Sequence, residues 1–361
     1  MIVNSISIMA SVTAEVSNPG SRQTPAFHRL FWLLFGISIA AQFYNVFRGI
    51  WDHDEVEHLH AAWLVAQGKI PFVDFFEHHQ PILWYLLAPL TGIFEPAQAV
   101  IAGRLIMLLF VAGTLILVLD MARRLTGRLD LALLSVMLLQ GSYGFAGVSL
   151  EIRPDVAQTF FMCLALDFFI IWTTSHAFGH ALLWGSALGC AIAILHKAIV
   201  WLPAFALGAL ILLIRERAHR WRTFGQAFVA FSGCALWVLG EYAALAWKGA
   251  LDDYLELGFG FNLAIHIKSQ LGLHLPRMEA LLLTIGKSTF LFILGLLGLF
   301  PLLSRLKEPL PATVVACVGG SLFFSVHFAH ALRAVFFACS GGFFPDRCVV
   351  LPEIMERFRK V

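Results

Sequence analysis

The stretch WDHDEVEHLHAAWLVAQGKIPFVDFFEHHQPILWYLLAPL occupies residues 51–90 and interrupts a chain that is otherwise strongly apolar. It holds six carboxylates and five histidines, all between residues 52 and 79. Such a concentration of ionisable groups beside apolar segments is unfavourable unless they face water, a partner or a ligand. The stretch is therefore the first candidate for a functional site.

The composition on either side of this stretch is that of a membrane protein. Of 361 residues, 59% are hydrophobic and 13% are charged, whereas about a quarter of a soluble domain is charged. Many apolar runs are long enough to cross a bilayer, so we predict an all-α, polytopic membrane protein. The net charge of +2, without a long basic stripe, argues against a nucleic-acid partner.

The cysteines give no sign of a disulfide or zinc framework. Those inside apolar runs lack paired C-x-x-C spacing and are expected to be small core residues: Cys163, Cys190, Cys234 and Cys317.

The apolar runs predict about nine transmembrane helices. We place them at residues 30–47, 97–119, 130–148, 156–173, 181–195, 198–214, 224–247, 281–303 and 310–333. The first resembles an uncleaved anchor, since no convincing small-residue cleavage site follows it. Arg22 and Arg29 precede it, which predicts a cytoplasmic N-terminus. We expect residues 1–27 to be a disordered cytoplasmic segment.

Residues 81–94 decide the topology of everything that follows. They are few for a span and include Pro89. If they crossed, the arginine-rich loop 121–128 would face outward, against the positive-inside rule. We therefore predict an interfacial or re-entrant helix, which places 48–96 in the first extracytoplasmic loop and the basic loops 215–222 and 304–307 in the cytoplasm.

One domain accounts for this pattern, because no soluble segment is long enough to fold separately. It covers residues 28–338, with residues 48–96 as its extracytoplasmic loop and further outer segments at 147–155 and 248–279. Residues 339–361 change character, and we expect an atypical C-terminal tail there: a truncated or frame-shifted end, or a small amphipathic segment.

The apolar spacing of residues 55–67 predicts a helix lying on the bilayer. Asp54 then stands where an N-cap is expected, and Glu55 would complement the helix dipole. Against this purely structural role, Asp52 and Glu57 add two more carboxylates beside the membrane. Such clustering points to a cationic or polar ligand.

The EHHQP motif offers further polar side chains in the same loop. His78 and His79 beside Glu77 are able to bind a metal, and Asp54 with His58 has the i, i+4 spacing of two ligands on one helix face. Adjacent surface histidines are more often solvated, so no metal or other cofactor is assigned, and a divalent cation stays open.

Charges also gather at the outer end of a later span. Pro154 followed by Asp155 is ordinary helix-start chemistry, yet Glu151 and Arg153 add two charges at the same boundary. Lys197 adds a cation on the same face, although it could simply snorkel. A site of this kind suits a substrate that is half lipid and half phosphate, with a carboxylate as general base and the cations neutralising the departing phosphate.

The ordered set of motifs resembles the GT-C superfamily of membrane glycosyltransferases, which includes dolichyl-phosphate-mannose protein mannosyltransferases and the aminoarabinose transferase of lipid A. The matching features are the acidic loop with Asp54 and Glu55, EHHQPILWYLLAPL, the arginine-containing span VIAGRLIMLLF, the RRLTGR loop and the outer RPD. Together they cover about residues 30–215.

The resemblance implies an inverting glycosyltransferase of the plasma (inner) membrane. A sugar would pass from a polyprenyl-phosphate donor to a protein, lipid or glycan on the extracytoplasmic face, with membrane lipid as the second partner. Asp54 would be the base, with Glu55 alongside. The implied donor and substrate residues are His78, His79, Glu151, Arg153, Asp155 and Lys197. The residue before the family's proline commonly helps hold the donor phosphate; the candidates for that position are His78, His79 and Gln80, where the aminoarabinose transferase type has Lys.

Two other classes of function compete with this interpretation. A transporter or flippase of a lipid-linked or anionic substrate would place its ionisable residues near the midplane, whereas these charges lie at one boundary. A membrane subunit or metal sensor would require His58, His78 and His79 to converge.

Overall fold

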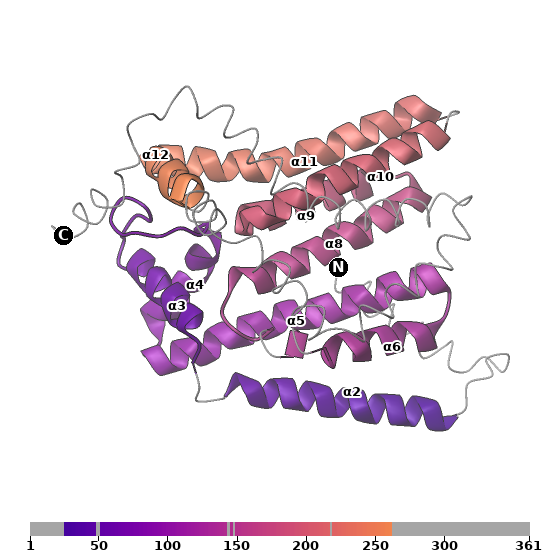
Figure 1. Ribbon diagram of the computed structural model, residues 1–361, viewed down its shortest axis with the longest axis horizontal. Helices are drawn as coiled ribbons and strands as arrows, with labels where there is room; N and C mark the ends of the chain where they lie inside the picture. Colours follow the sequence, from indigo (N-terminus) through magenta and orange to yellow (C-terminus); the bar gives the residue numbers. More distant parts are fainter. Residues whose placement is uncertain (1–24, 48–50, 143–144, 147–148, 217–218, 262–361) are drawn as a thin grey trace, which may run out of the picture.

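The computed structural model describes residues 25–47, 51–142, 145–146, 149–216 and 219–261 (Figure 1). Within these ranges the chain is almost entirely helical and forms no strand, apart from an isolated bridge between Pro71 and Phe75. The all-α prediction is confirmed for this part of the chain.

Five helical segments are long and apolar enough to cross a membrane. They are α2 (Pro25–Val46), α5 (Pro96–Thr126), α8 (Pro154–Ser175), the 3₁₀ segment η1 (His196–Trp201) continued by α10 (Leu202–Arg215), and α11 (Arg220–Trp247). Figure 1 shows them side by side in one bundle. They correspond to five of the nine predicted spans.

Two further predicted spans form shorter helices. These are α6 (Leu129–Gln140) and α9 (Phe178–Ile194). Among the described residues, α6 ends at Gln140, short of the predicted span 130–148, and the Ser142 hydroxyl donates a hydrogen bond to the carbonyl oxygen of Leu139 at 2.7 Å. The predicted spans 281–303 and 310–333, with residues 1–24 and 339–361, lie outside the described residues.

Helix ends in the bundle follow from local chemistry. Pro96 opens α5 and Pro154 opens α8, where a missing N–H costs nothing. The far end of α5 carries Arg123 and Arg124, which complement the helix dipole, and Gly127 closes it at φ +66°. These signals set where each long helix leaves the bundle.

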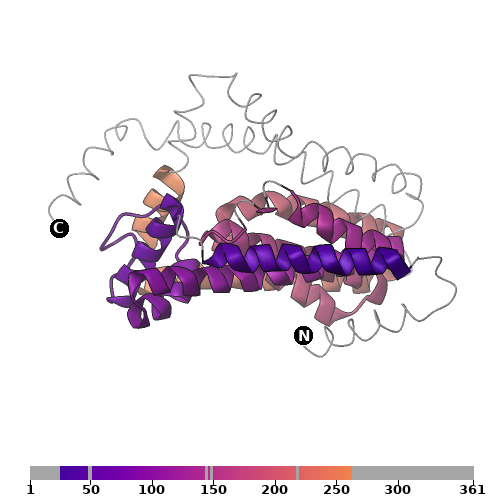
Figure 2. The ribbon, with the colours of Figure 1, turned by 90° about the horizontal axis from the view of Figure 1, so that it is seen from below.

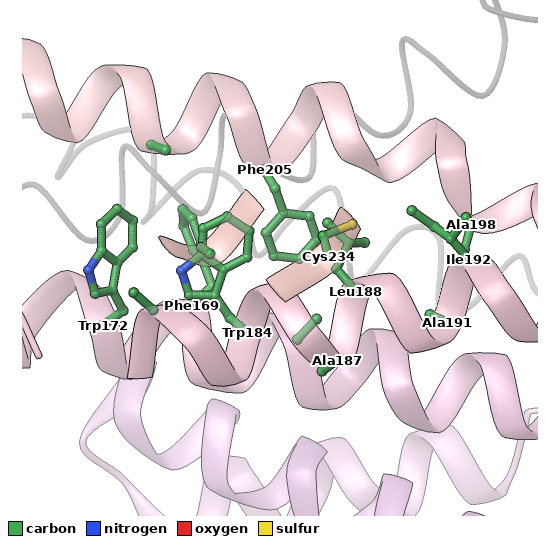
Figure 3. Close-up of a cluster of buried hydrophobic side chains, with 14 of the residues drawn as sticks. Phe169, Trp172, Trp184, Ala187, Leu188, Ala191, Ile192, Ala198, Phe205 and Cys234 are labelled. Atoms are coloured by element: carbon green, nitrogen blue, oxygen red, sulfur yellow. The ribbon is translucent and has the colours of Figure 1, made fainter. Parts of the chain in front are cut away.

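Aromatic packing holds α8, α9 and α10 together. Phe169, Trp172, Trp184 and Phe205 are fully buried, and the rings of Trp184 and Phe205 stack at 5.4 Å (Figure 3). This core makes a rigid support for the loops at its ends.

Glycines let α9 approach α11 closely. A Cβ atom built on Gly185 would collide with the backbone of Ala230, and one on Gly189 with the backbone of Cys234. Small residues four apart are the usual means by which membrane helices pack closely. The GSALG segment therefore fixes the α9–α11 contact.

Four short helical segments gather at one end of the bundle, here called the loop end (Figures 1 and 2). It contains α3 (His53–Ala66), α4 (Ile82–Ile93), α12 (Leu251–Tyr254) and the π-helical segment η3 (Leu255–Phe261). With twelve residues, α4 is only about 18 Å long, too short to cross a bilayer. The opposite end holds the basic helix termini, with Arg123, Arg124, Arg128, Arg215 and Arg220.

Gly185→Val should destabilise the protein by about 1–3 kcal/mol or more, because the new side chain meets backbone that cannot rotate away. Thermal unfolding in detergent would measure the loss. Gly179→Val is the matched control on the same helix, since no atom lies within 4 Å of its Cβ position. Equal stability of the two variants would contradict the close contact.

Candidate functional site

The first turn of α3 is capped by Asp52. The Asp52 carboxylate accepts a hydrogen bond from the backbone N–H of Asp54 at 3.0 Å, and the Asp52 N–H donates to Glu55 Oε2 at 3.1 Å. The expectation that Asp54 caps the helix is wrong, because α3 begins at His53 and not at Glu55. The Asp54 side chain is thereby available for other contacts.

Glu55 is fully buried in an ion pair with Arg104 of α5. Arg104 donates from Nε to Oε1 at 2.8 Å and from Nη2 to Oε2 at 2.6 Å. The N–H of Ile152 adds a bond of 3.3 Å, and Arg104 Nη1 donates to the carbonyl oxygen of Val46 at 3.3 Å. This pair joins α3 to α5, to the end of α2 and to the segment before α8.

No role was predicted for Arg104 from the sequence. A guanidinium within an apolar span is energetically unfavourable unless a counter-charge reaches it. The arginine in VIAGRLIMLLF therefore indicated that a buried acidic partner should exist. The identity of the partner, Glu55, follows only from the fold. With no exposed surface, Glu55 does not face a substrate in this structure.

Asp54 lies beside Arg153 at the loop end. Its Oδ2 is 2.9 Å from Arg153 Nη2, and its Oδ1 is 2.9 Å from His53 Nε2. About a quarter of the Asp54 side chain is exposed. Glu151 and Asp155 also approach Arg153, at 3.2 Å and 3.8 Å.

Lys197 completes this group from the start of η1. Its Nζ is 3.5 Å from Asp155 Oδ1, on an exposed edge where an ion pair contributes little stability. Burial raises the pKa of Glu151, although Arg153 opposes the shift. The structure thus brings five of the predicted site residues into one cluster, here called the arginine patch: Asp54, Glu151, Arg153, Asp155 and Lys197.

A second cluster surrounds the buried carboxylate of Glu77. His79 Nδ1 lies 3.0 Å and His78 Nδ1 3.3 Å from Glu77 Oε1, and Glu57 is 3.9 Å from His79. Burial alone would raise the pKa of Glu77, but hydrogen bonds from the two histidines hold it well below its usual range. We call Glu57, Glu77, His78 and His79 the histidine cluster.

His58 packs between the loop and α4. The indole N–H of Trp84 donates to His58 Nδ1 at 3.2 Å, and the His58 and His79 rings lie 5.0 Å apart. Burial lowers the pKa of His58 to about 4, so its ring is neutral at pH 7. Its contacts are those of a buried structural histidine.

Two groups among the described residues have metal-ligand atoms within 4.8 Å of one another. One is the histidine cluster, and the other consists of Asp52, His53 and Asp54. Asp54 and His58 were considered as a ligand pair from the sequence, but neither group contains both of them. Glu57 was not considered as a ligand, because its distance from the EHHQP motif along the chain hides their proximity.

Two polar contacts anchor the loop end to the bundle. Gln80 Nε2 donates to the carbonyl oxygen of Ile192 in α9 at 3.3 Å. His196 Nε2 lies 2.6 Å from the hydroxyl of Tyr254, which is buried against Phe72. Neither contact was expected from the sequence.

Glu55→Leu and Arg104→Leu should each lower the free energy of unfolding by about 3–5 kcal/mol, because each leaves an unpaired buried charge. The double variant should lower the free energy of unfolding by less than the sum of the two single variants, since it leaves no unpaired charge. Unfolding in detergent would measure all three. Arg128→Leu, which breaks an exposed pair with Asp130, is the control; strictly additive losses would contradict the coupling.

Comparison with known protein families finds a match that covers the middle of the chain. Residues 78–238 match the family model of dolichyl-phosphate-mannose-protein mannosyltransferases. No curated protein and no solved structure matches the chain. The matched range includes Arg104, Arg153 and Lys197 and begins after Asp54. Over this range, the resemblance of the chain to the GT-C membrane glycosyltransferases is confirmed by its match to the dolichyl-phosphate-mannose-protein mannosyltransferase family.

Proposed function

We propose that the protein is an integral-membrane glycosyltransferase that transfers a sugar from a polyprenyl-phosphate donor to a hydroxyl-bearing acceptor, with inversion. The observation that carries the proposal is the arginine patch. It sets a partly exposed carboxylate, Asp54, 2.9 Å from a guanidinium, Arg153, at the end of an apolar bundle. The family match supports the reaction class.

Asp54 is the proposed general base. Its carboxylate would accept the proton of the acceptor hydroxyl while the hydroxyl oxygen forms a bond to the anomeric carbon. The bond from that carbon to the phosphate oxygen breaks at the same time, and its electron pair leaves with the phosphate. A single displacement of this kind inverts the anomeric configuration.

Arg153 and Lys197 are the proposed cations for the departing phosphate. Three carboxylates surround Arg153 in this structure, and a phosphate would replace one of them. Guanidinium groups bind phosphate oxygens through parallel hydrogen bonds, whereas the exposed ammonium of Lys197 acts as a mobile point charge. His78 and His79 are proposed to contribute to the donor phosphate site.

Glu55 takes a different role from the one that the resemblance implies. Its two oxygens already accept bonds from Arg104, Asp52 and Ile152. We propose that it positions the first turn of α3 and does not exchange protons with substrate.

The proposed location of the site is the extracytoplasmic face of the plasma membrane. The arginine-rich helix ends lie at the opposite end of the bundle from the arginine patch. The positive-inside rule would place those basic ends in the cytoplasm. A lipid-linked donor could then reach the patch from the outer leaflet.

Asp54→Asn should reduce transfer about 10²- to 10⁴-fold, because the amide cannot accept the proton, while donor binding survives. Membranes would be assayed with a panel of radiolabelled polyprenyl-phosphate sugars. Asp252→Asn is the control, an exposed carboxylate on α12 at the same end.

Either of two results would contradict the proposal. Full activity of Asp54→Asn would remove the base from this residue. No transfer by the unmodified protein from any donor in the panel would remove glycosyl transfer itself and favour a transporter.

A further inference from the structure

The histidine cluster places four possible ligand atoms close enough together for a metal site, all within 4.8 Å of one another. The Nδ1 atoms of His79 and His78 lie 3.0 and 3.3 Å from Glu77 Oε1, and Glu57 Oε1 lies 3.9 Å from His79 Nδ1. Zinc binds histidine nitrogen and carboxylate oxygen at about 2.0–2.2 Å, so neighbouring ligands of a tetrahedral ion are about 3.3–3.5 Å apart. The measured separations fall around that value.

Hydrogen bonding alone explains this arrangement poorly. Four nitrogen atoms lie within 3.4 Å of the single oxygen Glu77 Oε1: both Nδ1 atoms and the backbone nitrogens of His78 and His79. A carboxylate has about four acceptor sites over its two oxygens. A cation between the imidazoles and the carboxylate would relieve this crowding, since both rings would then offer lone pairs in place of protons.

The surroundings of the cluster are those of a built site. The Glu77 side chain is 5% exposed and those of His78 and His79 about 30%, so the donors are held beneath the surface. The next residue, Gln80, is hydrogen-bonded to the carbonyl oxygen of Ile192 in the bundle. Glu57, 42% exposed, leaves the outer side accessible to water or to an anionic group.

The other candidate group is weaker. The His53 side chain is 87% exposed. Asp52 already caps α3, and Asp54 already pairs with Arg153. Its polar atoms therefore have partners that explain their positions.

We propose that Glu77, His78 and His79, with Glu57 as the fourth protein ligand or beside a bound water, hold one zinc ion. Two imidazoles with carboxylate oxygen suit zinc, whereas magnesium and calcium prefer oxygen ligands alone. A use of this ion in neutralising the donor phosphate rests on the proposed function; binding of the ion does not.

The test is direct zinc binding without any sugar donor. The full chain, purified in detergent through a tag free of histidine and stripped with a chelator, would be titrated with Zn²⁺ against a chromophoric indicator. We expect one ion per chain. Co²⁺ should substitute and give the absorption bands of a four-coordinate site.

Variants assign the ligands. His79→Ala and Glu77→Gln should weaken binding at least about 100-fold, since even supporting residues around a metal change affinity 10- to 100-fold. His60→Ala is the control, an exposed histidine on α3 that belongs to neither group. The helical circular dichroism signal and the elution volume in gel filtration would verify that each variant is folded. If one of the two ligand variants does not fold, His78→Ala takes its place.

The proposal is overturned if the unmodified protein binds no zinc, or if stoichiometric binding persists in folded His79→Ala and His78→Ala. Loss of binding in His53→Ala with retention in His79→Ala would also overturn it, because it would assign the ion to the helix start. Zinc binding without glycosyl transfer would contradict the proposed function and leave the metal site standing.

Discussion

The arginine inside an apolar helix is the constraint on which the loop end depends. Arg104 lies in α5 with its side chain almost fully buried, and a guanidinium in such surroundings requires a counter-charge and further acceptors. Glu55 supplies the charge, and the carbonyl oxygen of Val46 supplies another acceptor. This ion pair therefore joins the first turn of α3 to the bundle.

This constraint divides the acidic pair into two roles. Adjacent residues of a helix point about 100° apart, so turning Glu55 inward toward Arg104 directs Asp54 away from it. Asp54 then meets Arg153, and through it the carboxylates before α8. The buried carboxylate of Glu55 thus sets the direction of the partly exposed one of Asp54. The Asp52 cap adds to the same effect by ordering the turn from its N-terminal side.

Local patterns were enough to predict much of the architecture. The apolar runs predicted the long helices, Pro154 marked a helix start, and residues 81–94 were predicted to form a short helix, as α4 does. The clustering of Asp54 with Arg153 was expected only as a shared membrane boundary.

Contacts between distant segments could not be obtained this way. Glu55 and Arg104 are 49 residues apart, and the local sequence around either residue does not indicate that the other is its partner. Glu57 and Glu77 meet only because α3 folds back beside the EHHQP loop. The Asp54 cap was wrong because the helix begins two residues earlier than its apolar spacing indicates. The first two misses concern side chains whose partners are set by the tertiary fold, whereas the third concerns a local helix boundary.

Hydrogen exchange of the first turn of α3 tests most directly whether the buried ion pair holds the loop end in place. Mass spectrometry would compare the unmodified protein with Arg104→Leu in the same detergent. The amides around Glu55 should lose protection in the variant, while those of the α9 core around Trp184 keep theirs. Unchanged protection around Glu55 would contradict the account, as would an equal loss across both regions.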